Sequence, residues 1–327
     1  KGVTLKQLER STEALAVYET LDQRYGTDPD PALRVLVAQT LFNKGVALEQ
    51  LERNTEALAV YEELDQRYGT DPDTALRKAV AKALVSKGVA LEQLERSTEA
   101  LAVYETLDQR YSSDQDPAFR VVVAQSVVNK AGLLVQLGRH EEALLIFDTV
   151  DQRYGTDQDQ ALRVQAALAL ANRGVALGQL ERRAESIVAF DTVDQRYGTD
   201  TDPNLRVLVA GALNGSAFAR MMLAKQQLDM EAGRRERLTR AIDDLQRARA
   251  QCGSDDLAMV LGNLGYALFL SGETDEAEVH TRECLRLGRE TLLNGQREDA
   301  RMHRVEPQDT DYERMLDRLW EEVSGEA

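Results

Sequence analysis

Aromatic residues and prolines are scarce in this chain of 327 residues. Aromatic residues make up only 5% of the sequence while hydrophobic residues make up 43%. A core built from such a sequence has to consist of Ala, Leu and Val, which is the composition of closely packed helices rather than of a β-sandwich. Only six prolines are available to interrupt those helices. The composition therefore predicts an all-α protein.

Basic charge is also in short supply. Forty Lys and Arg face 56 Asp and Glu, which leaves a formal net charge of −16. Nucleic acids and anionic membranes both demand clustered Lys and Arg, so neither is predicted as a partner. No apolar stretch approaches the roughly 20 residues of a membrane span, and no signal-peptide pattern opens the chain. Two cysteines, Cys252 and Cys284, form no ligand spacing, which favours a reducing, cytoplasmic location.

Residues that carry chemistry are few and scattered. His140, His280 and His303 fall in different segments, and no glycine-rich phosphate loop is present. Carboxylates abound, but they recur in every repeat of the chain, whereas a catalytic pair needs one special environment. The sequence therefore predicts no metal, no cofactor and no enzyme activity.

Tandem repetition is what the chain has in abundance. Five copies of a 43-residue unit begin at Lys1, Lys44, Lys87, Lys130 and Arg173, and residues 44–69 are almost identical to residues 87–112. Such an array indicates a solenoid in which each unit buries its apolar face against its neighbours. Because Lys1 stands where mid-helix residues stand in the other copies, the chain is expected to be a fragment of a longer protein.

Each unit reads as two helices. The first follows an Asp that precedes the first turn, as at Asp30-Pro31, and is expected over about residues 31–51. A break at Glu52-Arg53 separates it from the second helix, for which Ser11, Asn54 and Ser97 are predicted as N-caps in successive copies. The second helix is expected to end at a left-handed cap such as Gly69.

Small residues are predicted where the two helices cross. They are Gly45, Gly88 and Gly174 in the first helix and Ala57, Ala100 and Ala143 in the second. The Asp-Gln-Arg-Tyr block that recurs in each copy, for example at residues 65–68, is interpreted as a ladder of ion pairs between units.

This pattern resembles the tetratricopeptide repeat family, in which an aromatic residue follows the second-helix Ala by one turn. Tyr61, Tyr104, Phe147 and Phe190 take that place. The family's period is about 34 residues, so this is a variant with a longer first helix and loop, and with Leu41 or Leu84 in place of the family's Trp. The resemblance implies a right-handed superhelical solenoid of antiparallel helix pairs.

Four segments are expected. Residues 1–215 form five repeats, the first truncated at its N-terminus, and residues 216–254 form a degenerate helix pair with an insertion near 226–236. Residues 255–296 form a further repeat, and residues 297–327 form a C-terminal capping helix.

The resemblance also places a binding groove on the first helices, with an apolar floor edged by glutamines. The groove residues that it implies are Gln39, Phe42, Asn43, Val46, Gln50, Lys82, Val85, Val89, Gln93, Gln125, Val128, Asn129, Gln136, Asn172 and Gln179. Burial of the valines between neighbouring first helices is the alternative. Family members that clamp a chaperone's C-terminal carboxylate use Lys and Asn side chains, and here only Asn43, Asn129 and Asn172 match, which favours an apolar helix or extended segment as the guest.

Two further segments have both a structural and a functional interpretation. Residues 233–240 are locally basic, and either pair with neighbouring carboxylates or bind an acidic partner. Residues 310–323 form an amphipathic helix with a capping box at Thr310–Glu313. That helix either covers the last repeat or docks a partner through Tyr312, Leu316 and Trp320.

The favoured function is a protein-interaction scaffold that binds a peptide or helix of a partner, serving as the regulatory or sensor arm of a larger bacterial protein. The partner is another protein, or another part of the same full-length chain. The alternatives are an effector or ligand-binding unit within residues 216–327, and assembly of the repeats into a homo-oligomer.

Overall fold

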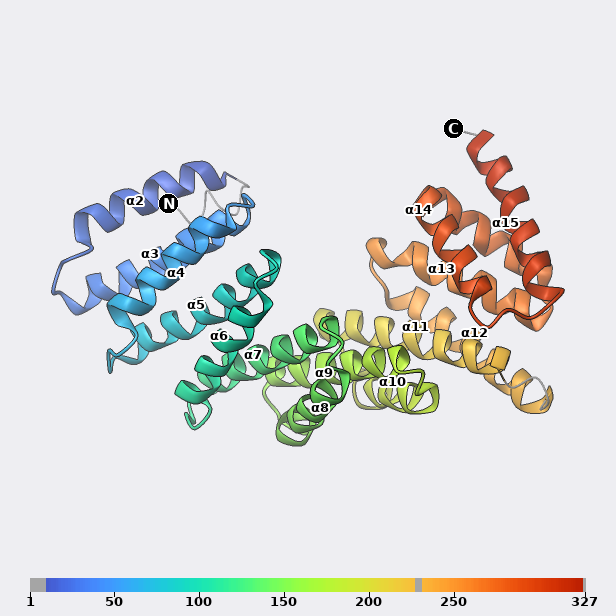
Figure 1. Ribbon diagram of the computed structural model, residues 1–327, viewed down its shortest axis with the longest axis horizontal. Coiled ribbons are helices and arrows are strands. Elements are labelled where there is room, and N and C mark those ends of the chain that lie inside the picture. The colour runs from blue at the N-terminus through green and yellow to red at the C-terminus, as the bar shows by residue number, and fades with distance from the viewer. Residues whose placement is uncertain (1–9, 227–230, 326–327) are drawn as a thin grey trace. The chain divides into compact units, whose positions relative to one another are not determined.

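The computed structural model of this chain describes residues 10–226 and 231–325, and every regular element in these ranges is an α-helix (Figure 1). The all-α prediction is confirmed. The chain divides into two compact units, residues 1–165 and residues 166–327, and the division falls within helix α9 (Gln160–Gln179).

The first unit consists of helix pairs joined by short turns. Its helices are α2 (Ser11–Tyr25), α3 (Pro31–Glu49), α4 (Asn54–Tyr68), α5 (Thr74–Gln93), α6 (Ser97–Tyr111), α7 (Pro117–Gln136) and α8 (His140–Tyr154). Each helix packs on the next one in the chain, and α5 also packs on both α3 and α7. The helices α4, α6 and α8 have 15 residues each and begin 43 residues apart.

An Asp caps each first helix, as predicted. The Oδ1 of Asp30 accepts hydrogen bonds from the amides of Ala32 at 2.9 Å and Leu33 at 3.1 Å. The bond from the amide two residues further on recurs in the other copies at Asp73, Asp116, Asp159 and Asp202. These carboxylates satisfy amides that the helix itself leaves unpaired.

The predicted caps of the second helices are wrong. Asn54 is the first helical residue, the N-cap is Arg53, and no side chain bonds to the free amides there. Instead the Arg53 guanidinium donates to both carboxylate oxygens of Glu56, each at 2.6 Å. The same bidentate pair forms at Arg96, Arg139 and Arg182 with the Glu three residues on.

The left-handed residue of each unit lies at the end of the first helix rather than the second. Glu52 has φ of 59° and Gly138, in the equivalent position, has φ of 73°, whereas Gly69 lies in the right-handed region with φ of −61°. Beyond that turn the amide of Arg53 donates to the carbonyl of Leu48 at 3.0 Å. This bond closes the first helix and reverses the chain.

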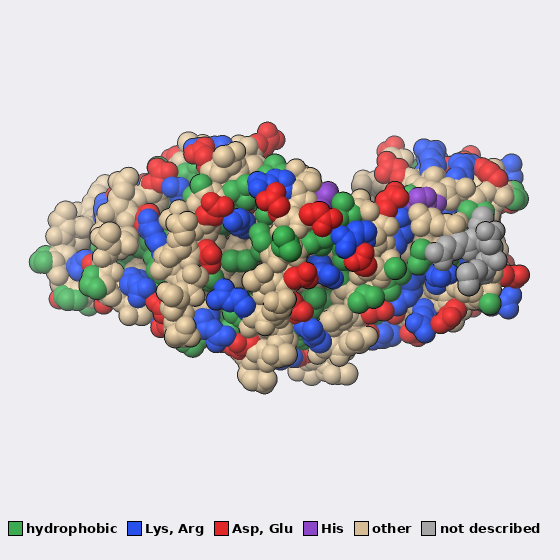
Figure 2. All heavy atoms as spheres, turned by 60° about the horizontal axis from the view of Figure 1, so that its bottom comes forward, with side chains coloured by type: hydrophobic (Ala, Val, Ile, Leu, Met, Phe, Trp, Pro, Cys, Tyr) green, Lys and Arg blue, Asp and Glu red, His purple; other side chains and the backbone are tan. Residues whose placement is uncertain are grey.

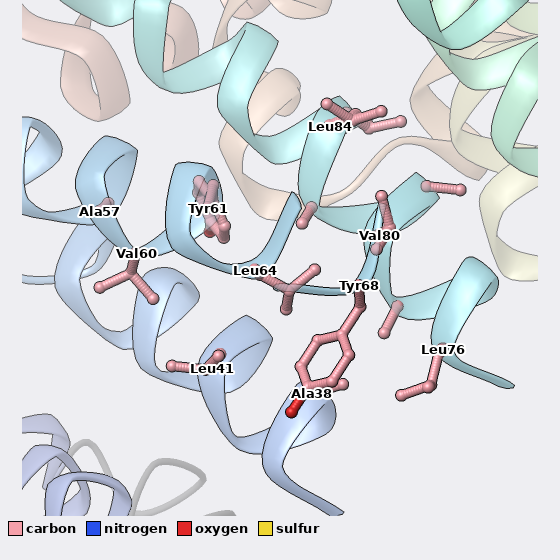
Figure 3. Packing of buried hydrophobic residues seen from close by; sticks show 14 of the residues in the cluster. Ala38, Leu41, Ala57, Val60, Tyr61, Leu64, Tyr68, Leu76, Val80 and Leu84 are labelled. Carbon is pink, nitrogen blue, oxygen red and sulfur yellow. The ribbon is translucent and has the colours of Figure 1, made fainter. Parts of the chain in front are cut away.

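The two helices of a pair cross at a glycine, as predicted. A Cβ placed on Gly45 would lie 2.3 Å from the Cε1 of Tyr61, and one on Gly88 would lie equally close to Tyr104. Figure 3 shows Tyr61 among the surrounding apolar side chains of α3, α4 and α5. Tyr61 is only 1% exposed, so its ring has no free space to move into.

Gly45→Ala is therefore expected to destabilise the protein by about 1–2 kcal/mol, because the added methyl group overpacks the contact with Tyr61. The matched control is Gly132→Ala in α7, where an added Cβ meets nothing within 4 Å. That variant should be neutral or slightly more stable because alanine favours the helix. Urea unfolding of both variants would test this, and equal midpoints would contradict it.

Ion pairs connect consecutive 43-residue repeats, which confirms the predicted ladder. Arg67 Nη1 lies 2.7 Å from Asp22 Oδ1, and Arg110 Nη1 lies 2.6 Å from Asp65 Oδ1. A second row joins the first helices to the next loop, with Arg77 Nη2 2.8 Å from an Asp114 oxygen. Exposed ion pairs of this kind contribute little stability individually. Because they recur at the same spacing, they favour one register of each 43-residue repeat on the next.

The second unit contains longer helices. It continues from α9 through α10 (Arg183–Tyr197), α11 (Pro203–Gln226), α12 (Glu231–Gln251), α13 (Ser254–Ser271), α14 (Thr274–Arg301) and α15 (Gln308–Gly325). Part of the insertion expected near 226–236 is helical, because α12 begins at Glu231. Residues 227–230 of this insertion lie outside the described ranges. Helix α14 also runs past the boundary expected at residue 296.

Helix α15 covers the last helix pair. Tyr312 is fully buried, with its ring centroid 4.5 Å from that of Tyr266 and 5.0 Å from that of Phe269. The predicted capping box is wrong, because the helix begins at Gln308 and Thr310 lies within its first turn.

Candidate functional site

Most of the predicted groove residues are accessible on the first helices. The glutamines Gln39, Gln50, Gln93, Gln125, Gln136 and Gln179 are exposed, as is Lys82. Phe42, Asn43, Val46, Val89, Asn129 and Asn172 are partly exposed. These side chains, taken separately in residues 10–165 and in residues 166–325, are called the first-helix groove below.

Two of the predicted floor residues are not accessible. Val85 is 6% exposed and Val128 is 1% exposed, so neither lies on a groove floor. Both take the repeat position that Phe42 takes in α3, and α5 packs on the first helices on either side of it, α3 and α7. The alternative, burial of the valine between neighbouring first helices, is correct at this position.

The structure brings four of the predicted residues together in the first unit. Gln39, Phe42 and Asn43 of α3 and Lys82 of α5 line one open hollow of about 360 Å³, with Ala75, Lys78 and Ala79 completing it. Lys78 is paired there with Asp116 at 2.8 Å. Its floor is therefore aromatic while its rim carries two lysines, so it is less apolar than predicted.

A more apolar hollow lies in the second unit. It has a volume of about 380 Å³, and α9, α10, α11 and the start of α13 contribute to it. Asn172 is the only predicted groove residue in its lining, whereas Val175, Val207 and Met259 were missed although they are 48%, 49% and 43% exposed. Val175 could have been found, because it takes the repeat position of Val46 and Val89.

A half-buried carboxyl group adjoins the groove in α5. Glu92 accepts a hydrogen bond from the hydroxyl of Tyr104 in the paired helix α6. Burial raises the pKa of Glu92, and the bond from Tyr104 partly opposes that rise. The pair joins the two helices of the unit and is not exposed as a reactive group.

Charges on the surface are mixed rather than segregated. Figure 2 shows acidic and basic side chains interspersed over the face in view, with apolar side chains between them. This agrees with the repeated Arg–Asp and Arg–Glu pairs and leaves no basic field on that face for an anionic polymer.

Comparisons with known proteins concern the type of repeat and the fold. Residues 1–72 match the family model described as tetratricopeptide repeat. Residues 1–72 therefore carry repeats of the tetratricopeptide type. Curated proteins give no match to the sequence.

Solved structures agree with this at the level of the fold. A tetratricopeptide repeat protein from Parabacteroides merdae superposes with a TM-score of 0.54 at 14% identity, over 92% of this chain and 95% of that one. BtubC (BKLC) from P. vanneervenii superposes with a TM-score of 0.56 at 17% identity, over 75% of this chain and 92% of that one. At such identities the likeness concerns helix arrangement alone.

Tetratricopeptide-type repeats generally serve as scaffolds for protein–protein interaction. The asparagines that match the family's carboxylate clamp, Asn43, Asn129 and Asn172, are all partly exposed on first helices. The neighbouring positions carry Phe42, Val46 and Val89 in place of further polar clamp residues. The first helices therefore carry apolar side chains beside these asparagines instead of the full set of polar clamp residues.

The terminal helix is not free to dock a partner as proposed. Tyr312 and Leu316 are fully buried against the preceding helices, and only Trp320 remains partly exposed. The apolar side chains that suggested a docking helix are instead buried against the preceding helices of the same chain.

The basic segment 233–240 is largely paired. Arg235 lies 3.4 Å from Glu231, Arg240 lies 3.0 Å from Glu236, and Arg234 donates to Gln308 Oε1 at 2.8 Å. These contacts support the interpretation that the arginines of this segment pair with neighbouring side chains.

No cluster of metal-ligating side chains occurs among the described residues. Both cysteines are free, and burial raises the pKa of Cys284 to about 12. Contrary to the sequence-based expectation, α7 and α11 are long and apolar enough to cross a membrane by length and composition alone. However, 50% and 67% of their apolar windows are buried inside the protein, as in core helices.

Proposed function

We propose that this chain is a non-catalytic scaffold whose first-helix groove binds an apolar peptide or helix of a partner protein. The observation that carries the proposal is the α9–α13 hollow, where Val175, Val207 and Met259 are each more than two-fifths exposed around one cavity. Apolar side chains gathered around a concavity mark interaction sites more strongly than isolated ones do.

The α3–α5 hollow extends the same proposal into the first unit. Phe42 supplies an aromatic floor, and Gln39 and Asn43 supply amide groups that can bond to a peptide backbone. A helix that presents apolar residues at intervals of three and four would contact successive first helices.

The test requires a partner recovered by pull-down, followed by calorimetry. Val175→Glu and, separately, Val89→Glu should weaken binding by roughly tenfold or more, because each places a carboxylate against an apolar guest. Val188→Glu on α10 is the matched control, since Val188 is 63% exposed on a second helix and should leave affinity unchanged.

Salt provides the second readout. Apolar burial is screened little, so affinity should change only slightly between about 50 and 150 mM salt. A steep loss of affinity with salt, or normal binding by both groove variants, would contradict the proposal.

Two alternatives remain to be tested by other means. Sedimentation across a concentration series would reveal homo-oligomeric assembly of the repeats. The full-length gene would test the prediction that the scaffold is a regulatory or sensor arm of a larger bacterial protein in the cytoplasm.

A further inference from the structure

A second cavity in the unit formed by residues 166–327 differs from the groove in having a buried charge. It has a volume of about 340 Å³ and is called the Arg183 pocket here. Its walls come from α9, α10 and α11, and Met302, in the connection from α14 to α15, lies at its edge. The lining that matters to the argument is Gly178, Arg183, Phe190, Phe218, Met222 and Met302.

Glycines create this space. A Cβ on Gly174 would lie 2.6 Å from the ring of Phe190, and one on Gly215 would lie 2.7 Å from it. These two residues allow the Phe190 ring to sit deep between α9 and α11. Gly178 is different, because a Cβ there would meet only Ser186 Oγ at 3.7 Å. A side chain at this position would clash with nothing and would extend into the pocket, so the glycine keeps the pocket open.

The Arg183 guanidinium is buried without an adequate counter-charge. Arg183 is 7% exposed, and its buried Nη1 has no hydrogen-bond partner. The paired carboxylate nearest to it, that of Glu181, lies 3.8 Å from Nη1 and is itself 69% exposed. Leaving a cation in this state is costly unless something pairs with it.

The other contact of Arg183 does not neutralise it. Its Nη2 lies 2.7 Å from His303 Nε2, which also lies 3.1 Å from Gln226 Nε2. Since both neighbours direct N–H groups at that nitrogen, it acts as the acceptor and supplies no negative charge to Arg183. The equivalent positions in the other four repeats are Ser11, Asn54, Ser97 and His140, so the buried guanidinium belongs to this copy alone.

We infer that the Arg183 pocket binds a small apolar carboxylic acid. The carboxylate lies against the Arg183 guanidinium, whose charge is otherwise matched only by the exposed Glu181 carboxylate, and the apolar part lies along Phe190, Phe218 and Met222. At about 30 Å³ for each water-sized group, 340 Å³ holds roughly ten non-hydrogen atoms. A medium-chain fatty acid has this size and chemistry.

The inference is tested by calorimetry with decanoate, decanamide and butyrate on the whole chain. Decanoate should bind one to one. Decanamide should bind roughly tenfold or more weakly because it lacks the charge that pairs with Arg183, and butyrate should bind weakly because it leaves the apolar walls uncovered.

Two variants separate pocket binding from adsorption of an amphiphile. Arg183→Met should remove the preference for decanoate over decanamide, and Gly178→Leu should fill the cavity and abolish binding of both. Arg235→Met, at a guanidinium that is 80% exposed, is the matched control and should bind decanoate normally. Each variant is first checked for folding by its thermal unfolding.

Several results would overturn the inference. They are absence of decanoate binding, equal affinity for acid and amide, or decanoate binding that survives Gly178→Leu. A short peptide ending in leucine with a free C-terminus that binds more tightly than decanoate would also overturn it and assign the pocket to a protein's C-terminal carboxylate. These outcomes are independent of the Val89→Glu test of the groove.

Discussion

Asp309→Asn is expected to destabilise the second unit by about 3–5 kcal/mol, because it removes the partner of a fully buried cation. Asp309 is 0% exposed, and the Lys225 side chain, 1% exposed, places its Nζ 3.1 Å from Asp309 Oδ2. Burial lowers the pKa of Lys225, and the Asp309 carboxylate opposes that change. Without the Asp309 carboxylate, the hydrogen bonds of the ammonium group go only to the Tyr266 hydroxyl and to backbone carbonyls, and Asp299 is the carboxyl group that still interacts with its charge.

The remaining contacts explain why the effect should extend over several helices. Asp309 also accepts from the Tyr266 hydroxyl at 2.7 Å and from the amide of Val305 at 2.6 Å. Lys225 donates to the carbonyl of Ala300 at 3.0 Å. The network therefore joins α11, α13, α14 and α15, and loss of its central charge loosens the covering helix.

A double variant provides the internal check. Lys225→Met with Asp309→Leu replaces the ion pair by apolar groups and should be less destabilised than the sum of the two single variants. Glu231→Gln is the surface control, because its pair with Arg235 is at least 80% exposed on both sides, and it should change the stability only slightly.

The measurement can use the chain's single tryptophan. Trp320 lies on α15, the same helix as Asp309, so its fluorescence during urea unfolding reports on the element concerned. An Asp309→Asn transition at the wild-type midpoint would show that the buried pair contributes no net stability.

Periodic features of the fold were predictable from sequence, because the same local signals recur in each copy. Asp30 and its counterparts cap the first helices, and the glycine at Gly45 permits the close approach to Tyr61. The start of the second helix was predicted wrongly, since a short polar residue such as Asn54 indicates a cap only if the turn before it is ordinary. Here Glu52 adopts the left-handed conformation, and Arg53 takes the cap position instead.

The candidate site was only partly predictable for a different reason. Val85 and Val89 are both valines on one helix, and their separation of about one turn does not reveal which faces a neighbouring helix. Packing of α3, α5 and α7 decides it, burying Val85 and leaving Val89 partly exposed. Likewise Lys225 and Asp309, or Arg183 and His303, are distant in sequence, so only the fold brings them together.

Deletion of residues 87–129 is expected to leave a folded protein of modestly lower stability, because every contact across the cut has an equivalent to replace it. Lys87 and Lys130 take the same repeat position, so the shortened chain joins the first half of α5 to the second half of α7 as one continuous helix. Arg77, which pairs with Asp114, would then face Asp157, the partner of Arg120 in the complete chain. In a solenoid, the stability lost on such a deletion is about that of one repeat and of one interface between neighbouring repeats.

A deletion of residues 87–126 is the matched control, since it removes nearly the same length but shifts the register by three residues. A shift of three positions rotates the joined helix by about 60° relative to its intended face, since successive residues are about 100° apart. Apolar residues that belong against the neighbouring helices would then face partly toward water, and the ion-pair rows would no longer meet. We therefore expect the 43-residue deletion to keep the helical circular dichroism and cooperative melting of the parent, and the 40-residue deletion to melt far lower or aggregate. Equal behaviour of the two deletions would mean that the 43-residue spacing does not determine how one unit packs on the next.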